Sequence, residues 1–432
     1  MTLLASGRST VQRQRAEFVG GYDCAVPAQT VTPLMRATRD QSAGALLQHL
    51  LMSGPTGRKT LARETGLSTT TVTKLTTMMT ESGLLTDEEP LDNGTVARAG
   101  AGRPERPLTF SAGTRAVLGV HVRENATTVT AYDLRQRPLA TARAAHRGRS
   151  ASAVLRGAAR LTQHLIDVRL GRLAPSPQVL GVGLSVGGTV DFERGTLIES
   201  PQLGWHDVDL AGPFADFDVP VLIDSSVRAL AVRQLWDADD PVGKTTVTIF
   251  VAGVVAAALI VDRRLLRGPG ASAGDIRHLP VRDGLGLRCW CGRTDCLGVT
   301  ASNRALYDHA VARGLLDPSV RWQSRVGEGY VDTPALAALR RRRAGWLGEA
   351  IATTIELVDP DTTVIFGYLG TDDDVRNCLS IIDARCAATL DGRQGRVLHR
   401  DSPASIWDAA SAALVLDDFL CRPTRYDRSL LT

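Results

Sequence analysis

The sequence predicts an α/β protein in two parts, a small helix-turn-helix head with a wing and a larger layered body. Between residues 58 and 84, small, glycine and apolar residues have the spacing of two crossing helices. From about residue 114, apolar strand-like segments alternate with helical ones, which is typical of a layered α/β core. The 432 residues suffice for two or three domains.

Composition and charge narrow the class of protein. The chain is 44% hydrophobic and 22% charged, which is usual for a globular protein. It has no apolar run long enough to span a membrane and no apolar secretion signal at its start. We therefore expect a cytoplasmic protein without a membrane partner. The net charge of +4 permits binding to nucleic acid but does not argue for it.

The chain divides into four predicted segments. Residues 1–36 are polar and lack periodicity, which predicts a flexible extension. Residues 37–112 are expected to form the winged helix-turn-helix domain. Residues 114–420 form the body, and residues 421–432 are a C-terminal tail.

Four positions predict the helix-turn-helix. Ala62 is small where the helices cross, and Gly66 turns the chain in the left-handed region. Val72 and Leu75 face inward. An ordinary helical hairpin has the same spacing and is the alternative interpretation.

The outward face of the second helix and the wing form the predicted DNA interface. Short hydroxyl side chains and one lysine suit a helix that lies in a major groove. An arginine on a thin Gly-Arg-Pro wing can enter a narrow minor groove, although a solvated basic linker has the same composition. The predicted DNA-binding residues are Arg58, Ser68, Thr69, Thr70, Thr73, Lys74, Arg98 and Arg103.

Three cysteines within eight residues predict a metal site in the segment 274–298. Cys289, Cys291 and Cys296 follow His278, which gives three thiolates and one imidazole. Four such ligands close a tetrahedral zinc shell and leave no open position, so the expected zinc is structural. Thiolates this close together repel each other unless a cation neutralises them.

Six motifs in order resemble the ROK family (repressors, open reading frames and sugar kinases): "GVGLSVGGTVD", "SPQLGWHDVDL", "VPVLIDSS", "AGDIRHLPV", "CWCGRTDCLGVTAS" and "VDPDTTVIFGYLG". The resemblance implies an actin-like, ribonuclease-H-like sugar-kinase fold of two lobes with the ligand site in the cleft between them. It also implies that zinc braces the loop 274–298, and that the protein is a homodimer or a dimer of dimers.

Family kinases differ from this chain at the residues that transfer phosphate. Their Asp-x-Gly-Gly-Thr turn is replaced by His121 followed by Arg123, Glu124 and Asn125, so side chains occupy the space for phosphate. Ser226 stands where the family has its catalytic aspartate, and a serine hydroxyl is not a base at neutral pH. We expect no catalytic residue, and no rescue by Asp224.

The sugar-binding positions are also altered. By resemblance, the ligand-binding residues are Gly188, Gln202, Ser225, Ser226, Asp275 and His278, while Gly298 replaces a carboxylate. Arg277 hints at an anionic effector, but we interpret it as a surface charge.

The predicted function is a transcriptional regulator, most simply a repressor, that binds a double-stranded DNA operator and senses a sugar or sugar phosphate. Two alternatives stay open: a sugar kinase with a regulatory head, and a DNA-binding protein whose body serves only oligomerisation.

Overall fold

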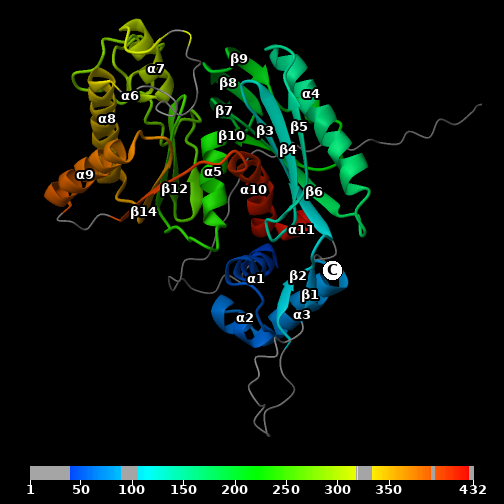
Figure 1. The fold of residues 1–432 in the computed structure, drawn as a ribbon. Coiled ribbons are helices and arrows are strands. Elements are labelled where there is room, and N and C mark those ends of the chain that lie inside the picture. The colour runs from blue at the N-terminus through cyan, green and yellow to red at the C-terminus, as the bar shows by residue number, and fades with distance from the viewer. Residues whose placement is uncertain (1–38, 89–105, 318, 320–332, 391–394, 428–432) are drawn as a thin grey trace, which may run out of the picture.

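The computed structural model of the chain describes residues 39–88, 106–317, 319, 333–390 and 395–427 (Figure 1). The predicted extension 1–36 and the wing residues Arg98 and Arg103 lie outside this part. Among the helices of the described ranges, none is both long and apolar enough to cross a membrane.

The head contains three helices and a two-stranded sheet. Ala62, Val72 and Leu75 are buried, and Gly66 ends the second helix at φ 68°, as predicted. The wing strands pair antiparallel, with Leu85 opposite Phe110. The elements are α1 (Arg39–Ser53), α2 (Arg58–Thr65), α3 (Thr69–Glu81), β1 (Leu85–Asp87) and β2 (Leu108–Phe110). The two crossing helices, the turn between them and the paired strands of the wing are therefore arranged as predicted.

The body consists of two five-stranded sheets with the same topology. The strand orders are β5-β4-β3-β6-β10 and β13-β12-β11-β14-β15, so each sheet places its strands in the order 3-2-1-4-5. In each, the first three strands pair antiparallel and the last two join in parallel. The first sheet comprises β3 (Arg115–Val122), β4 (Ala126–Tyr132), β5 (Pro138–Ala145), β6 (Gln178–Val186) and β10 (Val221–Ser225). The second comprises β11 (Thr246–Val251), β12 (Val255–Val261), β13 (Arg264–Leu266), β14 (Thr362–Gly367) and β15 (Arg396–Arg400).

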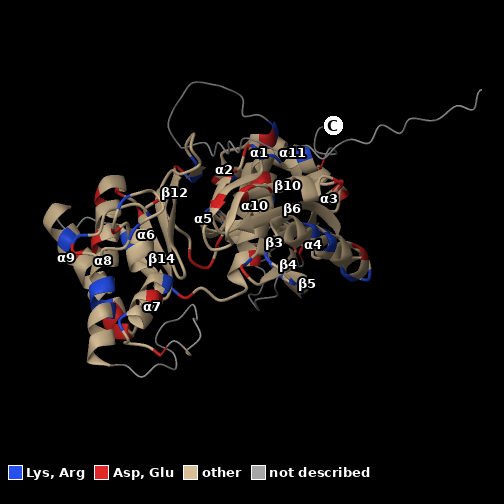
Figure 2. Ribbon diagram, turned by 90° about the horizontal axis from the view of Figure 1, so that it is seen from above, with Lys and Arg blue, Asp and Glu red and all other residues tan. Residues whose placement is uncertain are grey.

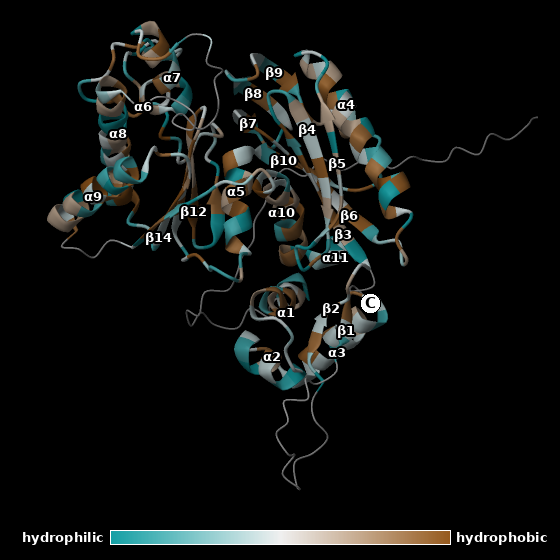
Figure 3. Cartoon of the chain, in the orientation of Figure 1, coloured by the Kyte–Doolittle hydropathy of each residue, from teal (hydrophilic) through white to brown (hydrophobic). Residues whose placement is uncertain are grey.

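Helices cover both sheets and separate the lobes. On the outer face of the first sheet, α4 alternates hydrophobic and hydrophilic residues (Figure 3), as a helix with one buried side must. The covering elements are α4 (Ala151–His164) with its π-helical continuation η1 (Leu165–Leu170), α6 (Leu297–Ala301), α7 (Asn303–Ala312), α8 (Pro334–Val358) and α9 (Asp372–Thr389). A small sheet, β7 (Thr189–Asp191), β8 (Thr196–Ser200) and β9 (Trp205–Asp209), and the turn η2 (Gly212–Phe214) extend the first lobe.

Two helices, α5 (Ser226–Leu235) and α10 (Ile406–Cys421), lie side by side between the lobes (Figure 1). α10 packs on β3 and β6, where Gly119 and Gly183 let its backbone approach the sheet, since a Cβ at either position would collide with an α10 carbonyl. The sequence patterns did not reveal α10, because a helix buried on nearly all sides shows little amphipathic period.

The head packs against the C-terminal end of the body. α1 contacts α10 and the short helix α11 (Pro423–Tyr426). Gln48 Nε2 donates a hydrogen bond to the Leu420 carbonyl at 3.1 Å, and Asp40 Oδ1 accepts from the backbone and hydroxyl of Thr424 at 3.0 and 2.7 Å. The first residues of the predicted tail therefore belong to this contact.

Candidate functional site

The predicted metal ligands converge in the second lobe. One ligand atom from each of His278, Cys289, Cys291 and Cys296 lies within 4.8 Å of the others. His278 Nδ1 is 3.5 Å from Cys289 Sγ, and Cys291 Sγ is 3.6 Å from Cys296 Sγ. Because Zn–S bonds of about 2.3 Å place tetrahedral sulfurs about 3.8 Å apart, the four atoms fit a zinc ion.

Hydrogen bonds within the loop hold its backbone in place around the cluster. Asp295 accepts hydrogen bonds from the backbone N–H groups of Leu285, Gly286 and Leu287 at 2.9–3.1 Å. Gly292 makes the turn between the ligands at φ 88°. Burial and the neighbouring sulfurs raise the pKa of the Cys296 thiol to about 12, so its thiolate needs a cation beside it.

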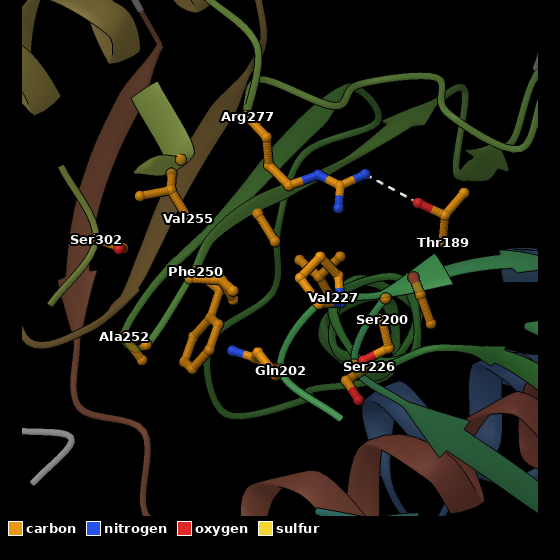
Figure 4. A pocket seen from close by; sticks show the side chains of 18 of the residues that line it. Thr189, Ser200, Gln202, Ser226, Val227, Phe250, Ala252, Val255, Arg277 and Ser302 are labelled. Atoms are coloured by element: carbon orange, nitrogen blue, oxygen red, sulfur yellow. Dashed lines mark hydrogen bonds between the residues drawn. The ribbon is translucent and has the colours of Figure 1, made fainter. Parts of the chain in front are cut away.

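A cavity of about 720 Å³ lies between the two lobes (Figure 4). It is the size of a small-molecule site. Of the predicted ligand residues, Gly188, Gln202, Ser225, Ser226 and Asp275 line it. His278 is not among the described lining residues, since its ring faces Cys289 and Trp290; its predicted ligand contact is not supported by the structure.

Asp224, two residues before Ser226, is enclosed by two arginines. Its side chain is 0% exposed. Oδ1 accepts from Arg228 Nη1 at 3.0 Å and from the Ser225 N–H at 2.7 Å. Oδ2 accepts from Arg267 Nε at 3.0 Å and Nη2 at 2.9 Å. Arg228 also donates to the Ala271 carbonyl, so the cluster ties β10 and α5 to the second lobe. Both oxygens are occupied by donors, which leaves no accessible lone pair for a substrate hydroxyl.

Aromatic rings lie beside the segment 121–125, which corresponds by resemblance to the phosphate-binding turn of ROK kinases. His121 stacks on Trp407 with ring centroids 5.4 Å apart, and Phe250 of the other lobe meets Trp407 edge-on at 4.6 Å. Burial, with Arg123 nearby, lowers the pKa of His121 to about 3, so the imidazole is neutral. It supplies no negative charge for a metal ion. The Arg123 and Glu124 side chains also line the cavity.

Arg277 lies in the cleft, and its prediction as a surface charge was wrong. The side chain is 15% exposed. It bonds both oxygens of Asp275, at 2.6–3.0 Å, and reaches across to Thr189 Oγ1 of the first lobe at 2.9 Å (Figure 4). The sequence could not reveal this pairing, because a charged residue in a loop is normally solvated.

Helix α3 presents the predicted DNA-contacting side chains on its exposed side. Thr69, Thr70, Thr73 and Lys74 are exposed. The Ser68 hydroxyl caps α3 by accepting from the Thr71 N–H at 3.1 Å. The exposed Thr77, one turn beyond Thr73, is a further residue of this face that the helical period could have indicated.

Arg58 differs from the other predicted DNA-contacting residues of the described head. Its guanidinium donates to Thr76 Oγ1 at 3.2 Å and to Asp87 Oδ1 at 3.1 Å. These bonds tie α2 to α3 and β1, so the structure favours an intramolecular role. In Figure 2, segments that carry Lys or Arg and segments that carry Asp or Glu are intermixed over the described part of the body.

Comparisons with known proteins agree with this architecture. A model of the ROK family matches residues 128–397. A transcriptional regulator of Mycobacterium tuberculosis (strain H37Rv) is 29% identical over 350 residues, which are 77% of this chain and 76% of that protein. A solved ROK family transcriptional regulator, a homologue of the Escherichia coli Mlc protein, superposes with a TM-score of 0.69 at 20% identity, covering 89% of this chain and 98% of that one. A ROK hexokinase from Thermus thermophilus gives 0.54 at 18%, covering 69% and 97%. The fold is thus the two-lobed sugar-kinase fold with an added head.

Proposed function

The chain belongs to the ROK family, and we propose that it is a DNA-binding transcriptional regulator, acting as a repressor, whose body binds a sugar-like effector without transferring phosphate. The observation that carries the proposal is the exposed polar face of α3 on a winged head that is joined to a kinase-like body. The named relatives that are transcriptional regulators support the same function.

The effector signal has a direct path to the head. Trp407, at the start of α10, lines the cavity, and Leu420, near the end of the same helix, contacts Gln48 of α1. A shift of α10 on ligand binding therefore displaces the head. The change in DNA affinity cannot exceed the difference between the effector's affinities for the protein with the head in its two positions.

DNA binding is tested on the full-length protein. An operator is selected from random duplexes, and its affinity is measured by fluorescence anisotropy at several salt concentrations. We expect tight, salt-dependent binding to the selected duplex and weak binding to a scrambled one. Equal affinity for both duplexes contradicts the proposal.

The kinase alternative requires a base, and Ser226 and the enclosed Asp224 do not supply one. The alternative in which the body serves only oligomerisation predicts that no small molecule changes DNA affinity. A screen of sugars and sugar phosphates by thermal shift, followed by DNA binding with each hit, separates it from the proposed regulator.

His278, Cys289, Cys291 and Cys296 would hold one structural zinc ion. Its contribution would be to fix the loop that carries Asp275 and Arg277 into the cleft, with no bound water to activate. We further propose a cytoplasmic homodimer or dimer of dimers, because helix-turn-helix proteins commonly read two half-sites. Light scattering of the protein with and without operator measures the assembly.

A further inference from the structure

Every carboxylate that lines the cavity in the described residues is already paired with an arginine. A sugar hydroxyl donates its proton favourably to a carboxylate, and each of these pairs takes up part of that acceptor capacity. The pairs are Glu124–Arg149 at 3.3 Å, Asp275–Arg277 at 2.6 Å and Asp308–Arg304 at 2.8 Å.

Two further positions carry no carboxylate. Residue 226 is a serine, and residue 298 is a glycine, where an added Cβ would lie 3.4 Å from the Arg277 carbonyl oxygen. Asp224, behind Ser226, is fully buried between Arg228 and Arg267. The cavity therefore offers donors rather than free acidic acceptors among the residues that the structure describes.

Arg277 is the donor best placed for a ligand. Its Nε and Nη2 groups are engaged by Asp275 and Thr189, which fix the plane of the guanidinium, whereas no hydrogen bond engages Nη1 among the described residues. The guanidinium also lies 5.9 Å from the ring of Trp290, which lines the same cavity. A guanidinium whose plane is fixed in this way can donate a hydrogen bond from its remaining nitrogen to a carboxylate or phosphate oxygen.

Buried hydroxyls add two more groups that lack a partner. Ser200 is 0% exposed and Ser226 is 9% exposed, and neither Oγ has a hydrogen-bond partner in the described structure. Both residues line the cavity (Figure 4). Since buried polar atoms normally find a partner, these hydroxyls indicate that the cavity is built to hold a polar ligand.

We propose that the cleft binds an acidic ligand of sugar size, and that Nη1 of Arg277 contacts its carboxylate or phosphate group. This inference rests on the proposed effector-sensing function. Asp275 serves to position Arg277. The lining side chains contain four arginines and three carboxylates, Arg123, Arg228, Arg277, Arg304 and Glu124, Asp275, Asp308, so the anion is not repelled by a net negative wall.

The test measures binding of matched probes to the full-length protein by isothermal titration calorimetry. Glucose, glucuronate and glucose 6-phosphate share one ring, and N-acetylglucosamine with its 6-phosphate forms a second set. We expect at least one acidic member to bind and its neutral counterpart to bind on the order of tenfold to a hundredfold more weakly. Comparing the affinities for glucuronate and glucose 6-phosphate shows whether the site binds a carboxylate or a phosphate.

Variants locate the contact. Arg277→Gln should reduce affinity for the acidic probe by on the order of tenfold or more, and Arg277→Lys should restore part of it because the charge returns without the fork. The control Arg376→Gln removes an arginine paired with Asp373 on the exposed side of α9 and should change nothing. Unfolding temperatures without ligand check that each variant folds.

Three results overturn the inference: tighter binding of a neutral probe, an acidic probe whose affinity is the same in Arg277→Gln, or no binding by any probe. The first leaves the proposed regulator intact if that neutral probe changes operator affinity. The proposed function is contradicted by a separate measurement, namely equal affinity for operator and scrambled DNA.

Discussion

Two groups of residues lie near one cavity: the cluster of His278, Cys289, Cys291 and Cys296 in the second lobe, and Asp224 with Ser226 in the first. They differ in how far apart in the chain their contacting residues lie. In the cluster, His278 contacts Cys289, which is 11 positions away in the chain, and Cys291 contacts Cys296, which is 5 positions away. Asp224 is bound by Arg267, which is 43 positions away in the other lobe. Chemistry that depends on near neighbours is visible as a spacing, whereas chemistry that depends on distant partners is not.

This difference also separates what each region does. The cluster brings four ligand atoms within 4.8 Å of one another, close enough to hold a metal ion. The base position has lost its carboxylate, and the nearby one is enclosed between arginines that join the lobes. The proposed regulator thus keeps the residues that would hold a loop in place, while the carboxylate beside Ser226 is engaged by arginines.

The largest effect is expected at the cluster. Cys291→Ser should reduce bound zinc from about one equivalent per chain to a small fraction and lower the free energy of unfolding by about 5 kcal/mol, because the unfolded chain holds no preformed site. Elemental analysis and denaturant unfolding measure the two quantities. Cys386→Ser, which alters a buried thiol far from the cluster in sequence, should keep its zinc. Fresh wild-type protein with well under half an equivalent of zinc would falsify the site.

The next effect concerns the enclosed carboxylate. Asp224→Asn leaves Arg228 and Arg267 buried without a negative partner, which should cost about 3–5 kcal/mol of unfolding free energy. Asp373→Asn, from an exposed pair, should cost under about 1 kcal/mol. Denaturant midpoints with matched slopes give both values. A small loss at Asp224 would mean that the link between the lobes is not structural.

A smaller effect is expected on the head. Lys74→Ala should weaken binding to all duplexes alike and reduce the slope of log affinity against log salt by about 0.9, since one phosphate contact is lost. Lys244→Ala in the body is the charge-matched control and should leave the slope unchanged. A Lys74→Ala protein with the wild-type slope argues for the plain helical hairpin.

Arg103→Ala tests the wing, whose tip lies outside the described residues. It should weaken binding most to operators whose flanks have a narrow minor groove, where an inserted arginine gains most. Affinities for two operators that differ only in A-tract flanks provide the comparison. Equal losses on both operators would indicate a solvated linker rather than a groove contact.

The smallest effect is expected in catalysis. Restoring the family residue with Ser226→Asp should not create sugar-dependent ADP release, because His121, Arg123 and Glu124 still occupy the phosphate turn. The wild-type protein with ATP, magnesium and hexoses should match a blank without protein. Turnover in wild type that Asp224→Asn abolishes would show that Asp224 acts as a base.

The local features were predictable from the sequence. The crossing at Ala62, the turn at Gly66 and the four cluster ligands depend on residues close together in the chain, so spacing alone specifies them. The strands of the first sheet were also visible, because apolar runs bounded by turns have a characteristic length, whereas β15 of the second sheet was not predicted. The wing pair was predicted as well, although its tip is outside the described residues.

Only the tertiary structure decided which side chains share an environment. It placed α10 between the lobes and against the head, joined Asp224 to Arg267, and moved Arg277 from an expected surface position into the cleft beside Thr189. It also turned Arg58 toward Asp87 and placed the His278 ring against Trp290 and Cys289. The physical reason is that a side chain's charge, donors and burial are set by neighbours from distant segments, and a single sequence carries no record of those distances.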